Sequence, residues 1–200
     1  KDKDEKLIIL YTNNPEEQFG FVKKANDRGY DVLHLDGPLA PHWIAKMEQS
    51  NENVQFARVD ADTLDKLIQK DEEIPSKLTQ EDEDKLKPMF ENVVNKEKFT
   101  VQFESMNADD APVIITQPEF IRRMMEQQRM GGGGYMAAFP EMHNLVVNSN
   151  HDKVNAILNT KTKKSQERKI KQLTDIALLS QGMLKGEELN KFIERSIELI

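Results

Sequence analysis

The chain has 200 residues, enough for one large or two small domains. Its 35 acidic residues outnumber its 28 basic ones, and the resulting net charge of -7 argues against binding to nucleic acid. The absence of cysteine excludes disulfides, thiolate catalysis and cysteine-based zinc sites, and it suits a reducing cytoplasm. No apolar run approaches the length of a membrane span, and no signal-peptide pattern opens the chain.

The first third of the chain alternates predicted strands with predicted helices. It opens on a charged run, 1–6, without an initiating Met, so we expect a piece of a longer protein. The next run, Leu7–Tyr11, is apolar throughout, as in a strand that is covered on both faces. The alternation implies parallel pairing with right-handed crossovers, hence a small three-layer α/β unit. The predicted strands are 7–11, 30–35 and 54–59, and the predicted helices are 14–28, 41–48 and 63–68.

A charged, core-poor stretch at 69–85 marks the predicted boundary between an α/β subdomain at 1–72 and a second domain at 73–200. Thr79 can cap a helix whose first turn is rich in acids, and Pro88 is expected to kink or restart that helix. Further strands are predicted at 99–103, 112–115 and 144–148. We therefore expect an α+β domain with a small sheet, continued by a helical dimerisation bundle.

A methionine-rich helix precedes a run of four glycines in the second domain. Five of the nine methionines lie between Met124 and Met142. Thr116 to Glu119 fits a capping box at the start of the helix. Because methionine is unbranched and polarisable, the apolar face either packs in the core or binds varied apolar segments. That face holds Phe120, Ile121, Met124 and Met125, and the opposite side holds Arg122, Arg123 and Glu126.

Two apolar helices, predicted at 164–181 and 187–200, end the chain. The first is apolar on nearly every side, so a second surface is needed to cover it. The pair could cap the sheet, but its apolar excess favours a homodimer in which four helices form a bundle. The residues predicted to make this contact are Ile170, Leu173, Ala177, Leu178, Leu179, Leu189, Phe192, Ile193 and Ile197.

Neither a catalytic nor a metal-binding constellation is recognisable. The four histidines are scattered without ligand spacing. The glycines at 131–134 follow a helix rather than a strand, which argues against a phosphate-binding loop. An enzyme would instead need a ligand at the carboxyl ends of the first strands, near Asn13, Asp36 and Asp60. This alternative, a small α/β enzyme domain fused to a helical dimerisation module, stays open on the residues alone.

Several stretches resemble the ninety-kilodalton heat-shock chaperones. The longest, 124–150, is similar to the carboxy-terminal domain of that family, above all in its bacterial high-temperature protein G branch. Three others, Leu7–Asn13, Asp36–Trp43 and Arg58–Asp62, resemble the last α/β subdomain of its middle domain. The chain lacks the Glu-Glu-Val-Asp ending of eukaryotic cytosolic members, so we expect a bacterial origin.

The resemblance implies a cytoplasmic, ATP-driven, constitutively dimeric chaperone of the stress response, of which this chain is the distal third. The family's nucleotide pocket and catalytic arginine lie in earlier parts, so this piece is expected to be no enzyme and to hold no cofactor. ATP and Mg²⁺ would bind the full-length protein. The expected partners are a second copy and unfolded or partly folded clients, with no nucleic acid and no membrane. The implied client contacts are Phe120, Ile121, Met124, Met125 and, on the middle-domain side, Trp43.

Overall fold

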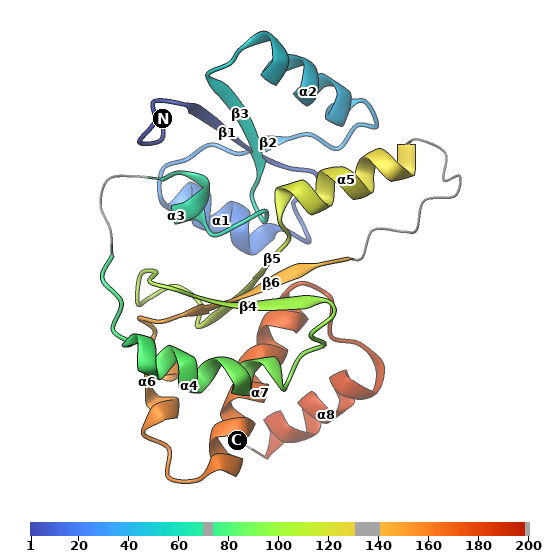
Figure 1. The fold of residues 1–200 in the computed structure, drawn as a ribbon. Helices are drawn as coiled ribbons and strands as arrows, with labels where there is room; N and C mark the ends of the chain where they lie inside the picture. The colour runs from blue at the N-terminus through green and yellow to red at the C-terminus, as the bar shows by residue number, and fades with distance from the viewer. Residues whose placement is uncertain (70–73, 131–140, 199–200) are drawn as a thin grey trace. The chain divides into compact units, whose positions relative to one another are not determined.

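The computed structural model describes residues 1–69, 74–130 and 141–198 of the chain. Its contacts divide the chain into two compact units (Figure 1). Unit 1 comprises 1–73 and 116–139, and unit 2 comprises 74–115 and 140–200. Unit 1 is therefore assembled from two separate parts of the chain. The predicted domain boundary at residue 72 stays a prediction.

Unit 1 is built on a parallel sheet of three strands in the order β2-β1-β3. The central strand β1 (Leu7–Thr12) pairs with β3 (Val54–Arg58), and its carboxyl end pairs with the short β2 (Leu33–His34). Neighbouring side chains of a strand point to opposite faces, and Leu10 and Tyr11 accordingly enter two different core clusters. Both faces of this sheet therefore need helices to cover them.

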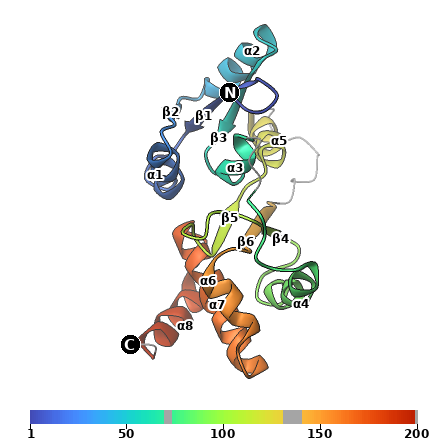
Figure 2. The same ribbon diagram turned by 90° about the vertical axis from the view of Figure 1, so that its left-hand side faces the viewer.

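Helices cover both faces of the sheet in unit 1. Ala25 of α1 (Phe19–Asp27) and Leu64 of α3 (Leu64–Leu67) pack with Leu10, and Ile44 of α2 (Ala40–Ser50) packs with Tyr11. Figures 1 and 2 show α2 on one side of the strands and α1 with α3 on the other. The predicted three-layer α/β arrangement is thus confirmed. A further helix, α5 (Glu119–Met130), also belongs to unit 1.

The second strand of unit 1 is much shorter than the predicted 30–35. It lies at the sheet edge and pairs only with Tyr11 and Thr12, so just Leu33 and His34 are in register with a partner. Tyr30 and Val32 instead pack against the core as part of the connection. The apolar pattern located a segment that packs partly against the core, but the pairing available at the edge decided how much of it became strand.

Unit 2 places a small sheet against a layer of helices. The strand order is β4-β6-β5, with β4 and β6 parallel and Phe99 opposite His143. The strands are β4 (Phe99–Glu104), β5 (Val113–Thr116) and β6 (His143–Asn148). The helices α4 (Gln80–Glu91), α6 (Asp152–Leu158), α7 (Lys163–Ser180) and α8 (Gly186–Ile197) lie on one side of it in both views (Figures 1 and 2). This is the expected α+β arrangement.

One detail of unit 2 differs from the sequence prediction, and a second narrows it. Of the two outcomes expected at Pro88, a restart is excluded, because α4 runs through Pro88 to Glu91 and the fully buried Phe90 anchors its last turn. The seven-residue helix α6 was not predicted. It is capped by His151, and its buried residues Val154 and Ile157 anchor it in the core. The predicted cap of α4 at Thr79 is confirmed, with Asp82 as the reciprocal partner.

The last two helices meet at a turn bounded by glycines. Gly182 and Gly186 adopt φ values of 63° and 59°, a conformation in which side chains with a Cβ are strained. The first of the two helices, α7, has 18 residues. Neither it nor another helix of the described residues is long and apolar enough to cross a membrane.

Candidate functional site

The amino-terminal end of α5 is tied to the end of β3. The Arg58 guanidinium makes two hydrogen bonds to the Asp60 carboxylate, at 2.5 and 2.9 Å, and a third to Gln117 Oε1 at 2.9 Å. The backbone N–H of Gln117 also donates to the carbonyl of Asp60 at 2.9 Å. These bonds fix where the helix enters unit 1.

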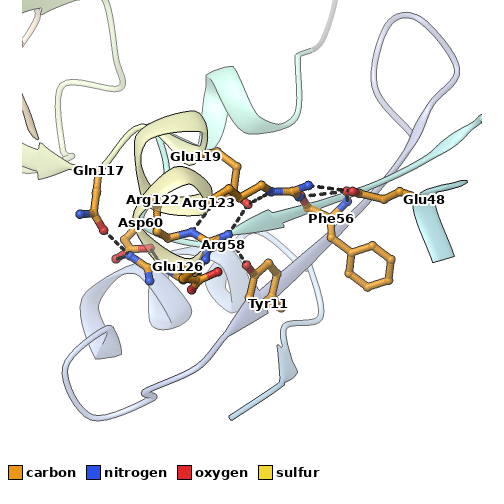
Figure 3. A network of polar contacts seen from close by, with 10 residues as sticks. All are labelled: Tyr11, Glu48, Phe56, Arg58, Asp60, Gln117, Glu119, Arg122, Arg123 and Glu126. Carbon is orange, nitrogen blue, oxygen red and sulfur yellow. Dashed lines mark hydrogen bonds and ion pairs between the residues drawn. The ribbon is translucent and has the colours of Figure 1, made fainter. Parts of the chain in front are cut away.

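The central contact of α5 is Arg122, which is 5% exposed. Its guanidinium donates to both carboxylate oxygens of Glu119, at 2.5 and 3.0 Å, and to Glu126 at 2.5 Å. The same group donates to the Tyr11 hydroxyl at 2.6 Å and lies 5.7 Å from that ring (Figure 3). Arg122 thereby joins its own helix to the central strand of the sheet.

The neighbouring Arg123 reaches a second point on unit 1. It makes paired hydrogen bonds to Glu48 of α2, at 2.8 and 3.0 Å, and a 2.7 Å bond to Glu119. It also donates to the carbonyl of Phe56 at 3.0 Å, while the N–H of Phe56 donates to Glu48 at 2.8 Å (Figure 3). Paired arginine–carboxylate bonds are directional, so the two arginines set the rotation of α5 about its axis.

The predicted capping box at Thr116 is wrong. Helix α5 begins at Glu119, and Thr116 is the last residue of β5. Its hydroxyl is buried and has no hydrogen-bond partner within the described parts of the chain. The reason is that the helix begins only at Glu119, so Thr116 lies too far before it to act as the cap, and the Glu119 carboxylate holds Arg122 and Arg123 instead.

The carboxylates of Glu48 and Glu119 are ionised at neutral pH. Burial alone would raise the pKa of Glu119, but Arg122 and Arg123 outweigh it and hold that pKa below its ordinary value of 4.5. Burial is likewise outweighed at Glu48, whose pKa Arg123 and the amide of Phe56 lower. Burial, and then the charge of Glu119, raises the pKa of Tyr11, which keeps its hydroxyl protonated. Removing one member would leave an unbalanced charge in a partly buried place.

The sequence placed Arg122 and Arg123 opposite the apolar face and left open which side is docked, and in the structure the arginine side contacts unit 1. The helix attaches by its arginine side, so part of its apolar side stays accessible. Phe120 is 68% exposed, and Ile121, Met124 and Met125 are half-buried. One sequence signal for this attachment is the spacing of Glu119, which lies three and four residues before the two arginines. This spacing indicates ion pairs that form within the helix.

Trp43 lies on α2 of the same unit and is 45% exposed. Its ring packs edge-on against Phe56, with centroids 5.4 Å apart. Phe56 is the residue whose backbone also bonds Glu48 and Arg123. Trp43 and α5 therefore attach to the same point of β3.

A cavity of about 260 Å³ opens at the carboxyl ends of β1 and β2. Asn13 and Asp36 line it together with Glu126 of α5, so the structure brings together two of the three polar residues named for an enzyme. The third, Asp60, is instead held by Arg58. No three His, Asp or Glu residues stand close enough to hold a metal ion in the described parts of the chain.

The residues predicted for dimerisation divide into two groups. Ile170 and Ala177 are buried in the core of unit 2. Leu179, Ile193 and Ile197 are exposed, and Ile197 is 66% exposed. The remaining ones, Leu173, Leu178, Leu189 and Phe192, are half-buried. The exposed group lies on α7 and α8, which are joined by a bond between Arg195 and the buried Asp175 at 2.5 Å.

Known proteins that resemble the chain agree with one another. No protein-family model matches it. The chaperone protein HtpG of Bacteroides fragilis strain 638R is 32% identical over 267 residues, and that of Bacteroides thetaiotaomicron is equally similar. The HtpG of Porphyromonas gingivalis strain W83 is 30% identical over the same length. Each match covers 100% of this chain.

The chain belongs to the HtpG family of chaperones. The sequence-based recognition of the bacterial branch of the ninety-kilodalton heat-shock chaperones is thereby confirmed. The chain spans 39% of the length of the HtpG relatives it matches. The activity, substrates and partners of a whole HtpG protein are therefore proposals for this chain.

Proposed function

We propose that the chain is the distal part of an ATP-dependent, cytoplasmic HtpG chaperone, where it joins two protomers and offers an apolar surface to unfolded or partly folded clients. It would not be an enzyme by itself, since ATP and Mg²⁺ would bind elsewhere in the whole protein. Neither nucleic acid nor a membrane is a proposed partner. The match to HtpG relatives over the whole chain supports this assignment.

One observation carries the client-binding part of the proposal. Helix α5 is attached by Arg122 and Arg123, so its position does not depend on burying its apolar side. Phe120 is therefore left 68% exposed, next to half-buried Met124 and Met125. Burial of such side chains stabilises a complex by about 25 cal/mol per Å² without directional demands. A surface of this kind accepts many different unfolded segments.

The test compares two exposed phenylalanines of unit 1. Phe120→Gln, alone and with Met124→Gln and Met125→Gln, should weaken binding of a permanently unfolded, chemically modified protein several-fold. The matched control is Phe19→Gln, because Phe19 is 64% exposed on α1. Client titrations and melting curves are recorded for all variants. Equal affinity of the Phe120 and Phe19 variants would refute the client-binding role of α5.

The dimerisation part rests on the exposed side chains of α7 and α8. Leu179 and Ile176 of α7 and Ile193 and Ile197 of α8 are exposed although they are large and apolar. Large apolar side chains left exposed on two packed helices suit a contact with another protein surface. In a twofold dimer each residue would be buried twice, so a single charge acts at two places. Ile193→Glu should turn a dimer into a monomer in sedimentation equilibrium, whereas Phe19→Glu should not. A wild-type monomer at tens of micromolar would contradict the proposal.

A further inference from the structure

The cavity of unit 1 has the size of a side-chain pocket. It opens where β1 and β2 end and α2 begins, a place where parallel sheets commonly bind ligands. Its volume of about 260 Å³ lies below the roughly 300–1,000 Å³ typical of small-molecule sites. It can hold one long side chain of another polypeptide, while the backbone of that polypeptide stays outside the cavity.

The pocket combines apolar walls with carboxylates. Leu35, Ala40 and Ile44 contribute apolar surface, and Asp36 and Glu126 contribute charge from two different elements. One carboxylate oxygen of Glu126 accepts a hydrogen bond from Arg122. The other oxygen has no polar partner among the described residues. Asp36 is exposed, and its nearest opposite charge is His34 at 3.6 Å when that ring is protonated.

The basic residues nearby do not cancel these carboxylates. Arg58, Arg122 and Arg123 each already hold a carboxylate of their own, and Arg122 is 5% exposed. Glu126 shares Arg122 with Glu119, and Asp36 pairs with none of the three arginines, so the carboxylates around the pocket outnumber the arginines. The pairs are Arg58 with Asp60, Arg122 with Glu119, and Arg123 with Glu48.

We infer that this pocket binds an arginine or lysine side chain of a client polypeptide, whose neighbouring apolar residues contact Trp43 and the apolar side of α5. Such a side chain lays its methylene stem along Ala40 and Ile44 and directs its charged end to Asp36 and Glu126. The inference rests on the proposed client-binding function and adds a preference to it. Apolar surface alone would accept any oily segment, and the pocket selects those with a basic residue.

The experiment uses matched peptides and the fluorescence of Trp43, the single tryptophan of the chain. An unstructured apolar peptide carries arginine, its neutral analogue citrulline, or glutamate at one central position. We expect the arginine peptide to bind about two- to fivefold more tightly than the citrulline peptide, as for one partly exposed ion pair. Asp36→Asn should remove this difference. Asp31→Asn, an equal change of charge at an exposed residue that does not line the pocket, should leave this difference intact.

Each result decides between the two levels of the proposal. Equal affinity for the arginine and citrulline peptides would overturn the inference and leave the client surface standing. If Asp36→Asn and Asp31→Asn reduced the preference for the arginine peptide equally, the inference would also be overturned. The peptide would then be attracted by the net charge of the protein rather than by the pocket. Failure of all three peptides, together with an unfolded protein, would overturn the proposed function itself. Melting curves of the Asp36 variant confirm that its fold is unchanged.

Discussion

Helices α5 and α7 both carry an apolar stripe, but they attach to their own units by opposite faces. In α7 the stripe is the attachment, because Ile170 and Ala177 are buried in the core of unit 2. In α5 the arginines are the attachment, and Phe120 on the apolar side is exposed. An amphipathic pattern therefore shows that a helix has two sides without showing which one is docked. The ion-pair partners of the polar side decide it.

The strongest way to break this comparison is to remove the central arginine of α5. Arg122→Met leaves Glu119 and Glu126 without their main partner in a partly buried place. Breaking a buried pair commonly costs about 3–5 kcal/mol, so we expect a loss of that size in the free energy of unfolding of unit 1. Urea denaturation measures it. The control, Arg168→Met, removes an exposed pair with Glu198 and should cost less than about 1 kcal/mol.

The next largest effect is expected from weakening the apolar attachment of α7. Ile170 is fully buried, so Ile170→Ala should lower the free energy of unfolding of unit 2 by about 2–5 kcal/mol. Ile176 on the same helix is 47% exposed, and Ile176→Ala should change it by no more than about 0.5 kcal/mol in the monomer. Thermal unfolding of both variants tests this. Similar losses in the two would mean that the helix is buried on both sides.

Acidification should release α5 but leave α7 in place. The folded-state pKa values of Glu48 and Glu119 lie below their ordinary value of 4.5. Their ionised forms thus stabilise the folded state fully above pH 4.5, and this stabilisation is lost as the pH falls below it through the folded-state values. Hydrogen exchange of α5 amides between pH 3 and 6 would show the release. In Glu48→Gln the dependence should be weaker, and an unchanged profile would contradict the assignment.

The smallest effect concerns the residue that sequence reasoning chose as a cap. The buried hydroxyl of Thr116 has no partner in the described parts of the chain, and such a group costs free energy. Thr116→Val keeps the shape and suits a strand, so we expect stability to rise by up to about 1 kcal/mol. A true cap would instead lose about 0.5–2 kcal/mol on this change. Melting temperatures distinguish the two signs.

Much of the fold could be predicted because the sequence pattern within each element indicates its secondary structure. The strand Leu7–Tyr11 is apolar throughout, and the terminal helices have helical periodicity over many residues. The short helix α6 escaped because seven residues hold too little periodicity. The docking of α5 escaped because its partners are distant in sequence: Arg122 bonds a residue 111 positions away, and Arg123 one 75 positions away. The sequence predicted a ligand site near Asn13 and Asp36. It did not predict that Glu126 also lines the pocket, because Glu126 lies there only when α5 docks on unit 1.

The two bonds at Phe56 have a consequence for the solubility of unit 1. Strand β3 lies at the edge of the sheet, where free backbone groups can recruit a strand from another molecule. At Phe56 both groups are occupied, the N–H by Glu48 and the carbonyl by Arg123. Two charged side chains thus stand where an incoming strand would have to pair. The open edge of β3 is therefore closed at this point to an extended chain from another molecule.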